Sequence, residues 1–342
     1  MADVALAERL RALGREAGLD ALGFAVAERF TSTRDDLVER RAAGLHGGMQ
    51  FTYRDPERST DPGRILPGAR SLVVGARSYR RRPPPAPAGP PTGRVAAYAW
   101  RDHYADLRTS LTVVAEALHD DGHRARVVLD DNALVDREAA VRAGLGWYGR
   151  NSTVLLPGRG SEFVLGSVVT DADLPADDRV DDGCGPCRRC LDACPTGALV
   201  APGVLDARRC LAWLVQAPGD IPEDLRAAMG DRIYGCDDCQ DVCPVNRRAG
   251  ADAVPPAEAD AEPRVDLLAL LDADDETLLA AHGRWYVPRR DPRYLRRNAL
   301  VALGNQARAD DRAAIAVLDR YAEGEDELLA RHARWARERV RR

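Results

Sequence analysis

Eight cysteines lie between residues 184 and 243 of this 342-residue chain, and their spacing constrains the fold more than any other feature. They form two runs, each followed directly by proline, with one cysteine between the runs: Cys184, Cys187, Cys190 and Cys194, then Cys210, then Cys236, Cys239 and Cys243. The first run has the C-x2-C-x2-C-x3-C-P spacing of bacterial ferredoxins, in which the fourth cysteine ligates the other cluster. Two 4Fe–4S clusters need eight thiolates, so we predict two clusters in a ferredoxin-like module.

The crossing rule divides the eight ligands between the two predicted clusters. One cluster is assigned to Cys184, Cys187, Cys190 and Cys243, and the other to Cys194, Cys210, Cys236 and Cys239. Zinc is the main alternative, because paired C-x2-C motifs also build structural zinc sites. Four cysteines within residues 184–194, followed by proline, favour cubane clusters. Two neighbouring clusters would form a path for electrons. The alternative is that the clusters only stabilise the fold.

The composition excludes several enzyme classes. The chain has no lysine, so all 49 basic side chains are arginine, and both a lysine Schiff base and a P-loop are ruled out. The N-terminus is amphipathic and charged and does not resemble a secretory signal, and no run of 18 apolar residues occurs. We therefore expect a cytoplasmic protein that does not enter a membrane, in which cysteines serve as metal or redox ligands rather than disulfides.

The rest of the chain divides into an α/β part and a helical tail. Helical patterns at 3–18, 102–121 and 137–144 alternate with strand patterns at 71–79, 125–130 and 152–170, which indicates an α/β layer architecture. The proline-rich segment 81–94 is predicted to be a surface loop that holds neither a helix nor a central strand. We expect three domains: 1–178, the cysteine module at 179–250, and 251–342.

The last domain changes the sign of its charge along the chain. Residues 251–283 contain nine acidic side chains against one arginine, whereas residues 284–342 contain fifteen arginines against nine acidic side chains. The basic tail has helical apolar periodicity that fits short stacked helices of the HEAT type. Arginine binds phosphate through its planar fork, so the tail is a candidate nucleic-acid face; a solvated helical surface is the alternative.

Two motifs lie near the end of the strand predicted at 125–130. Residues 144–149 match G-x-G-x-x-G, but they follow a helix and precede a strand, the reverse of a dinucleotide site, so we predict a tight turn with close backbone approach. The strand ends in Asp130 and Asp131, at an edge where α/β proteins bind ligands. Such an acid could donate a proton if burial raised its pKa; an exposed acidic loop is the alternative.

Several long motifs resemble the epoxyqueuosine reductase family. They occupy residues 44–51, 61–71, 143–151, 208–246 and 296–305, and so cover nearly the whole chain. The resemblance implies a cobalamin-dependent iron–sulfur enzyme that reduces epoxyqueuosine to queuosine at the wobble position of tRNA. It implies a mixed fold (α+β or α/β): a cobalamin-binding α/β domain, a two-cluster ferredoxin-like module and a C-terminal HEAT-like helical domain. The expected partners are tRNA and an unidentified electron donor, and we expect a monomer.

The resemblance also implies roles for individual residues. The family's proton-donating aspartate opens a D-x-x-P-x-x-[DE]-R segment, and the spacing to Asp136 and Arg137 selects Asp130 rather than Asp131, although Ala133 replaces the proline. Arg150 stands where members often have lysine, and Ser59 stands in place of a common arginine. The implied cobalamin contacts are Tyr98, Asn151, Ser152 and Gln240.

Two other functions are weighed against this one. A cobalamin-dependent reductive dehalogenase also combines cobalamin with two clusters, but those proteins typically carry a twin-arginine export signal, which is not seen here. A ferredoxin-like electron carrier without a substrate of its own would not need the roughly 180 residues that precede the cysteines.

Overall fold

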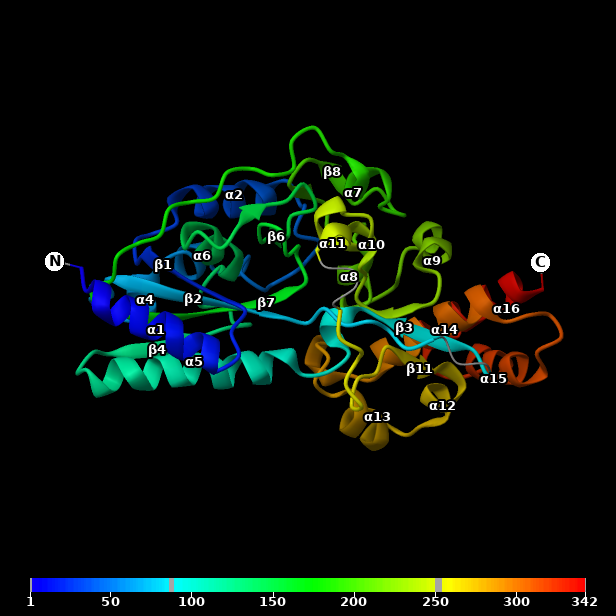
Figure 1. The fold of residues 1–342 in the computed structure, drawn as a ribbon. Helices are drawn as coiled ribbons and strands as arrows, with labels where there is room; N and C mark the ends of the chain where they lie inside the picture. The colour runs from blue at the N-terminus through cyan, green and yellow to red at the C-terminus, as the bar shows by residue number, and fades with distance from the viewer. Residues whose placement is uncertain (1, 86–88, 250–253, 342) are drawn as a thin grey trace.

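A four-stranded sheet forms the centre of the N-terminal half (Figure 1). The computed structural model describes residues 2–85, 89–249 and 254–341. The strand order is β1 (Ala21–Val26), β2 (Ser71–Ser78), β7 (Phe163–Thr170) and β4 (Ala125–Val128). Each neighbouring pair is antiparallel. The predicted strands at 71–79 and 125–130 are therefore present, and β1 is a strand that the sequence analysis missed.

Helices cover both faces of this sheet. One face packs against α1 (Val4–Glu16) and α5 (His103–Asp120), and the other against α2 (Thr31–Ala42) and α6 (Asp136–Arg142). Because both faces are covered, β2 and β7 are apolar and buried along most of their length. Gly75 and Gly166 pair across these two strands, and a Cβ on either would lie within 2.9 Å of the Leu111 side chain. The two glycines thus let α5 approach the sheet closely, and the predicted layer architecture is confirmed.

A small second sheet links distant parts of the chain. Its central strand is β3 (Thr92–Val95), which pairs in parallel with β10 (Arg232–Tyr234) and antiparallel with β11 (Arg264–Asp266). The prediction that 81–94 is a loop without a central strand is wrong at its end, because the prolines stop at residue 91 and the residues after them can donate to a ladder. Residues 86–88 lie outside the described part of the chain.

The cysteine module consists of short elements joined by tight loops. They are α7 (Arg189–Asp192), β8 (Leu199–Ala201), β9 (Val204–Leu205), α8 (Leu211–Leu214), α9 (Glu223–Met229), α10 (Asp238–Asp241) and α11 (Pro244–Arg248). Cys210 and Cys243 are the residues immediately before α8 and α11. Backbone N–H groups at the start of a helix carry partial positive charge, which favours a thiolate at this position.

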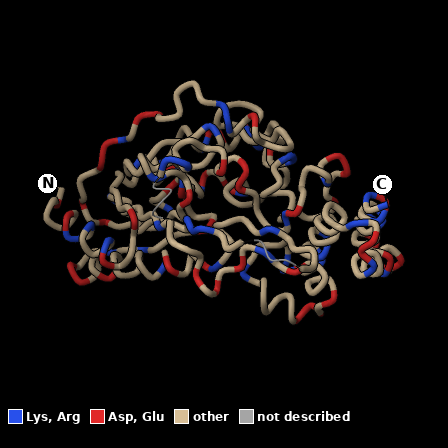
Figure 2. Tube along the Cα trace, turned by 45° about the vertical axis from the view of Figure 1, so that its right-hand side comes forward, with Lys and Arg blue, Asp and Glu red and all other residues tan. Residues whose placement is uncertain are grey.

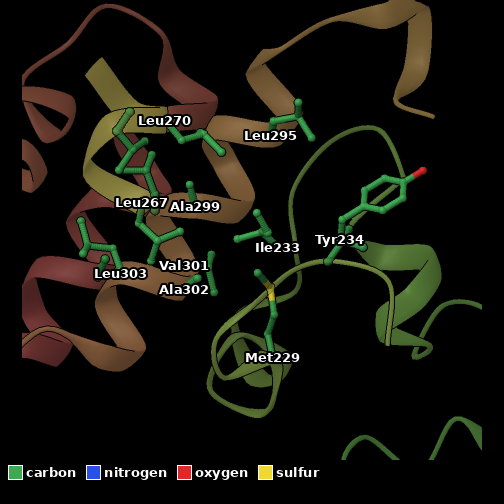
Figure 3. Packing of buried hydrophobic residues seen from close by; sticks show 14 of the residues in the cluster. Met229, Ile233, Tyr234, Leu267, Leu270, Leu295, Ala299, Val301, Ala302 and Leu303 are labelled. Carbon is green, nitrogen blue, oxygen red and sulfur yellow. The ribbon is translucent and has the colours of Figure 1, made fainter. Parts of the chain in front are cut away.

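The tail is helical, as its periodicity predicted. Its helices are α12 (Leu267–Asp272), α13 (Asp275–His282), α14 (Arg293–Gln306), α15 (Arg312–Ala322) and α16 (Glu327–Val340). Figure 3 shows Leu295 and Ala299 of α14 beside Ile233 of β10 and Leu267 of α12. The tail and the cysteine module therefore share one hydrophobic core, while the sheet has cores of its own on its two faces. The three domain boundaries stay predictions.

Several short elements complete the described structure. They are α3 (Pro56–Ser59), α4 (Pro62–Ile65), η1 (Ala97–Ala99), β5 (Trp147–Tyr148), β6 (Val154–Leu155) and η3 (Pro288–Arg290). The G-x-G-x-x-G segment forms the turn from α6 into β5, and a Cβ on Gly146 would lie 2.0 Å from the Leu155 carbonyl oxygen. The close backbone approach predicted there is confirmed. Across the described ranges, every helix is too short or too polar to cross a membrane.

Candidate active site

The cysteine thiols gather into two groups. All eight are free and partly buried. Burial raises the pKa of Cys239, and the nearby charges of Cys236 and Cys210 raise it further. Burial also raises the pKa of Cys210, and the charge of Cys194 adds to that shift. These four thiols are therefore neighbours in the fold, although Cys194 is 42 residues before Cys236 and 45 residues before Cys239.

The remaining cysteines of the first run form the other group. Burial raises the pKa of Cys190, and the charges of Cys184 and Cys187 raise it further. Cys190 also acts on Cys239, so the two groups lie next to each other, and α7 packs against α10 at this point. The ligand sets that the crossing rule predicts are compatible with these neighbours and stay predictions. The position of Cys243, directly before α11, is compatible with its predicted place in the Cys190 group.

Hydrogen-bond donors point at two of the sulfur atoms. The Trp147 indole N–H donates to Cys184 Sγ at 3.4 Å, and the Ala198 backbone N–H donates to Cys194 Sγ at 3.2 Å. Burial alone would raise the pKa of Cys194, but donors from Thr196 and Ala198 lower it overall. Hydrogen bonds to sulfur are a main means by which proteins tune iron–sulfur clusters.

Asp130 lies on the loop that follows β4. We call residues 130–135 the Asp130 loop. Its first residue is exposed and has a left-handed backbone with φ of 49°, which turns the chain away from the sheet. Asp131 Oδ1 accepts from the Ala133 backbone N–H at 3.0 Å, so this carboxylate is used to build the turn. Partial burial raises the pKa of Asp130, the charge of Asp102 raises it further, and Arg108 opposes the shift. The structure thus separates the two neighbouring aspartates, as the predicted choice of Asp130 requires.

A set of hydrogen bonds holds the Asp130 loop against the segment before α4. Asn132 Oδ1 accepts from the Thr52 backbone N–H at 2.8 Å, and the Asn132 carbonyl accepts from the Ser59 hydroxyl at 2.8 Å. The Val135 backbone N–H donates to the Ser59 carbonyl at 2.9 Å. The sequence analysis missed Asn132 and Thr52, because the two residues are 80 positions apart and neither belongs to a local pattern. Ser59, noted only as a substitution, is a structural anchor of this loop.

Tyr104, Tyr148 and Arg137 lie between the Asp130 loop and the cysteine module. Tyr148 keeps 40% of its surface exposed, yet burial among protein atoms raises its pKa. Burial likewise raises the pKa of the half-buried Tyr104, and Asp130 raises it further. Arg137 acts on Tyr104, Tyr148 and also Cys210, so it lies near both the neighbour of Asp130 and the second group of thiols. We call Asp130, Tyr104, Tyr148 and Arg137 the Asp130 site.

Comparison with known proteins identifies the family. A model described as a 4Fe-4S double cluster binding domain matches residues 183–246. Epoxyqueuosine reductase of Bacillus subtilis (strain 168) is 35% identical over 308 residues, which cover 88% of this chain and 79% of that protein. The chain belongs to the epoxyqueuosine reductase family. Members of this family are oxidoreductases, and the predicted iron–sulfur module is confirmed at the level of a 4Fe–4S binding domain.

Two solved epoxyqueuosine reductase structures share the fold. One contains an epoxyqueuosine-modified tyrosine tRNA stem loop; it superposes with a TM-score of 0.89 at 31% identity, covering 98% of this chain and 90% of that one. The other is the Bacillus subtilis enzyme with a catalytic aspartate loop swung out of the active site, with the same TM-score, identity and coverage. The likeness therefore extends over the α/β part, the cysteine module and the tail.

The four residues expected near cobalamin in an epoxyqueuosine reductase form two pairs with different surroundings in the structure. The Tyr98 ring lies beside Tyr234, with centroids 6.3 Å apart, and its hydroxyl accepts from the Gln216 amide at 3.2 Å. Ser152 is in the left-handed region with φ of 65°, and its buried hydroxyl finds no partner among the described residues. The Asn151 and Gln240 side chains are instead engaged inside the protein, by Thr153 and by Tyr79 and Ser161 respectively.

Proposed function

We propose that this chain reduces epoxyqueuosine to queuosine at the wobble position of tRNA. The observation that carries the proposal is the chain-wide match to epoxyqueuosine reductases. The nearness of Asp130, through Tyr104 and Arg137, to the thiols of the cysteine module supports it. Removing the epoxide oxygen as water breaks two C–O bonds and consumes two electrons and two protons. The chain must therefore supply both an electron path and a proton donor.

The electron path is assigned to two 4Fe–4S clusters. Cys184, Cys187, Cys190 and Cys243 would hold one, and Cys194, Cys210, Cys236 and Cys239 the other. The grouping of the thiols and the N–H donors to Cys184 and Cys194 support this assignment. Because Cys190 lies near Cys239, electrons could pass between the two clusters without leaving the module.

Cobalamin would bind at the Asp130 site and supply the reactive metal centre for reductive removal of the oxygen. The residues present fit a large polar cofactor: the Ser152 hydroxyl is buried without a partner among the described residues, and Tyr104 and Tyr148 offer rings and hydroxyls. Arg137 donates to the Ser152 carbonyl at 2.9 Å, which fixes Ser152 beside this site. Tyr98 and Ser152 are the implied contacts best placed for this role.

Asp130 is assigned the proton transfer to the departing oxygen. A general acid works best when its pKa lies near the working pH, and the surroundings of Asp130 shift its pKa in that direction. The α14–α16 helices would form the HEAT-like domain, and tRNA would lie against the Asp130 site. The electron donor stays unidentified. The family match gives no support to the alternatives of a reductive dehalogenase or a simple electron carrier.

Turnover of the substrate tests the proposal directly. The protein is reconstituted anaerobically with iron, sulfide and cobalamin and is given tRNA that carries epoxyqueuosine; queuosine should appear. Asp130→Asn should keep iron content and corrinoid absorption but lose about 100-fold or more in rate, as expected for a missing general acid. Asp131→Asn is the matched control, because asparagine can still accept from Ala133. Full activity of Asp130→Asn would reject the assignment.

A further inference from the structure

The loop between α13 and α14 presents an exposed aromatic ring. We call residues 284–290 the rim loop. Tyr286 is 56% exposed, whereas its neighbours Trp285 and Val287 are each 4% exposed. The buried neighbours fix the backbone on both sides, and the Arg284 guanidinium donates to the Ala99 and Trp100 carbonyls. The tyrosine ring is therefore exposed to solvent, while its buried neighbours hold the backbone in place.

The rim loop is attached to Tyr234, a neighbour of the Asp130 site. The Tyr286 backbone N–H donates to the Tyr234 hydroxyl at 2.7 Å, and the Trp285 ring stacks on Tyr234 with centroids 4.8 Å apart. Tyr234 in turn lies near enough to Asp130 that this carboxylate raises its pKa, in addition to the larger effect of burial. Tyr286 therefore lies one residue contact away from the neighbourhood of the proposed acid.

Two arginines of the rim loop have an unusual backbone. Arg289 and Arg290 both adopt left-handed conformations, with φ of 58° and 55°. Left-handed non-glycine residues cost free energy and occur preferentially at functional sites. Both side chains are exposed, and neither forms an ion pair with any residue in the described ranges. Their charges are available to an anionic ligand.

Most other arginines of the tail are already neutralised. Figure 2 shows acidic and basic residues interspersed at the C-terminal end. The paired side chains are Arg284 with Glu262, Arg293 with Asp291, Arg296 with Asp275, Arg308 with Asp310, Arg320 with Asp272, Arg331 with Asp220, Arg334 with Glu327 and Arg337 with Asp319. The net positive charge of the tail is therefore a poor guide to a phosphate-binding face, and the rim loop is a better one.

We propose that Tyr286 stacks on an unpaired base of the tRNA anticodon loop next to the modified nucleotide, while Arg289 and Arg290 contact the adjoining phosphates. The inference rests on the proposed function. Proteins read single-stranded RNA by stacking its bases on exposed aromatic rings and pairing its backbone with arginine. The rim loop offers this combination next to Tyr234 and the Asp130 site. It would hold the loop of the tRNA so that the modified base enters the site.

Binding of an epoxyqueuosine-modified anticodon stem loop to the reconstituted protein tests the proposal. Tyr286→Ala should raise Kd between about fivefold and a hundredfold, the range expected for one lost stacked base. Tyr286→Phe should stay within about twofold of wild type, and kcat at saturating RNA should be unchanged in both variants. Arg289→Gln and Arg290→Gln should each reduce the slope of log affinity on log salt by about 0.7, the value for one lost single-strand phosphate contact.

Arg312→Gln is the matched control, because Arg312 is exposed on the same tail and has no ion pair among the described residues. Its salt slope should equal that of wild type. Unchanged affinity in Tyr286→Ala would overturn the stacking role. If that variant does not fold, unchanged slopes in Arg289→Gln and Arg290→Gln would overturn the proposal. Failure of the wild-type protein to bind or turn over the modified RNA would instead reject the proposed function.

Discussion

At the scale of single residues, the charges around Asp130 matter as much as its position. The carboxyl group is exposed at the end of a strand but is surrounded by enough protein that its pKa is raised. Asp102, the N-cap of α5, raises the pKa further, whereas Arg108 on the same helix lowers it. One helix thus presents two opposite charges to the proposed acid. Substituting either residue should shift the pKa of Asp130 while Asp130 itself is left unchanged.

Substituting Asp102 should move the pH dependence of the reaction. An acid must be protonated to act, so the rate falls as pH rises through the pKa of Asp130. Asp102→Asn removes a negative neighbour and lowers that pKa, so the fall should begin at a lower pH. Asparagine still accepts from Ala105, so the helix cap is kept. Arg108→Gln should shift the fall to higher pH. Single-turnover rates across the pH range measure both shifts; displacement in the same direction would contradict the assignment.

Asn132 should act as a positioning residue for Asp130. Asn132→Ala removes the acceptor of the Thr52 N–H and so loosens the Asp130 loop. Because small misplacements of a catalytic group are costly, the single-turnover rate should fall about tenfold to a hundredfold. Iron content and RNA affinity should not change, and hydrogen exchange of residues 130–135 should accelerate. Gln50→Ala, on a neighbouring exposed amide, is the control. Unaltered exchange in Asn132→Ala would refute the role.

At the scale of elements, α14 joins the tail to the cysteine module through polar contacts inside the core. Arg297 is fully buried, and its guanidinium donates to the Leu214 and Ala217 carbonyls at 2.9 and 2.8 Å. Asn298 donates to the Val215 and Ile233 carbonyls. These carbonyls belong to the loop after α8 and to β10. One helix therefore satisfies backbone groups that the short elements of the module cannot pair among themselves.

Removing this guanidinium should destabilise the whole module. Burial lowers the pKa of Arg297 to about 10, so the group is still charged at neutral pH. Arg297→Met leaves the carbonyl groups without donors and should cost about 2–4 kcal/mol, a fall of about 5–10 °C in the thermal midpoint. Arg312→Met, on an exposed residue, should change stability by less than about 0.5 kcal/mol. Equal midpoints for the two variants, measured by circular dichroism on the reconstituted protein, would show that the buried contacts are dispensable.

These elements show which features of the fold could be predicted from local sequence patterns and which could not. The two groups of thiols follow from spacing, because residues two or three apart in a tight loop must lie together. The helices at 103–120 and 293–306 follow from apolar periodicity. The pairing of β3 with β10 and β11 could not be predicted, because a four-residue strand after a proline tract has no pattern of its own. Arg297 counted toward a basic surface in the sequence but is buried, since burial depends on tertiary packing.

At the scale of the whole molecule, the three hydrophobic cores are divided unequally between the parts of the chain. The sheet has one hydrophobic core on each face, built from residues between 6 and 174. The third core runs from Val95 through the region after Cys210 to Val340, and so includes the tail. The cysteine module contributes few buried apolar residues of its own before Leu211. We infer that the α/β part can retain its fold without the tail, whereas the cysteine module cannot.

Deletion of residues 284–342 should therefore abolish iron binding rather than merely weaken RNA binding. The deletion would expose Leu267, Ile233 and Met229, which face α14 in the intact protein (Figure 3). Exposing such side chains costs about 1.5–3 kcal/mol each, which exceeds what a module of short helices can tolerate. The truncated chain should retain strand signal in circular dichroism but lose the iron and acid-labile sulfide measured after reconstitution. Arg312→Gln with Arg339→Gln, which removes charge but no packing, should keep both. Full iron content in the truncated chain would show that the module folds independently of the shared core.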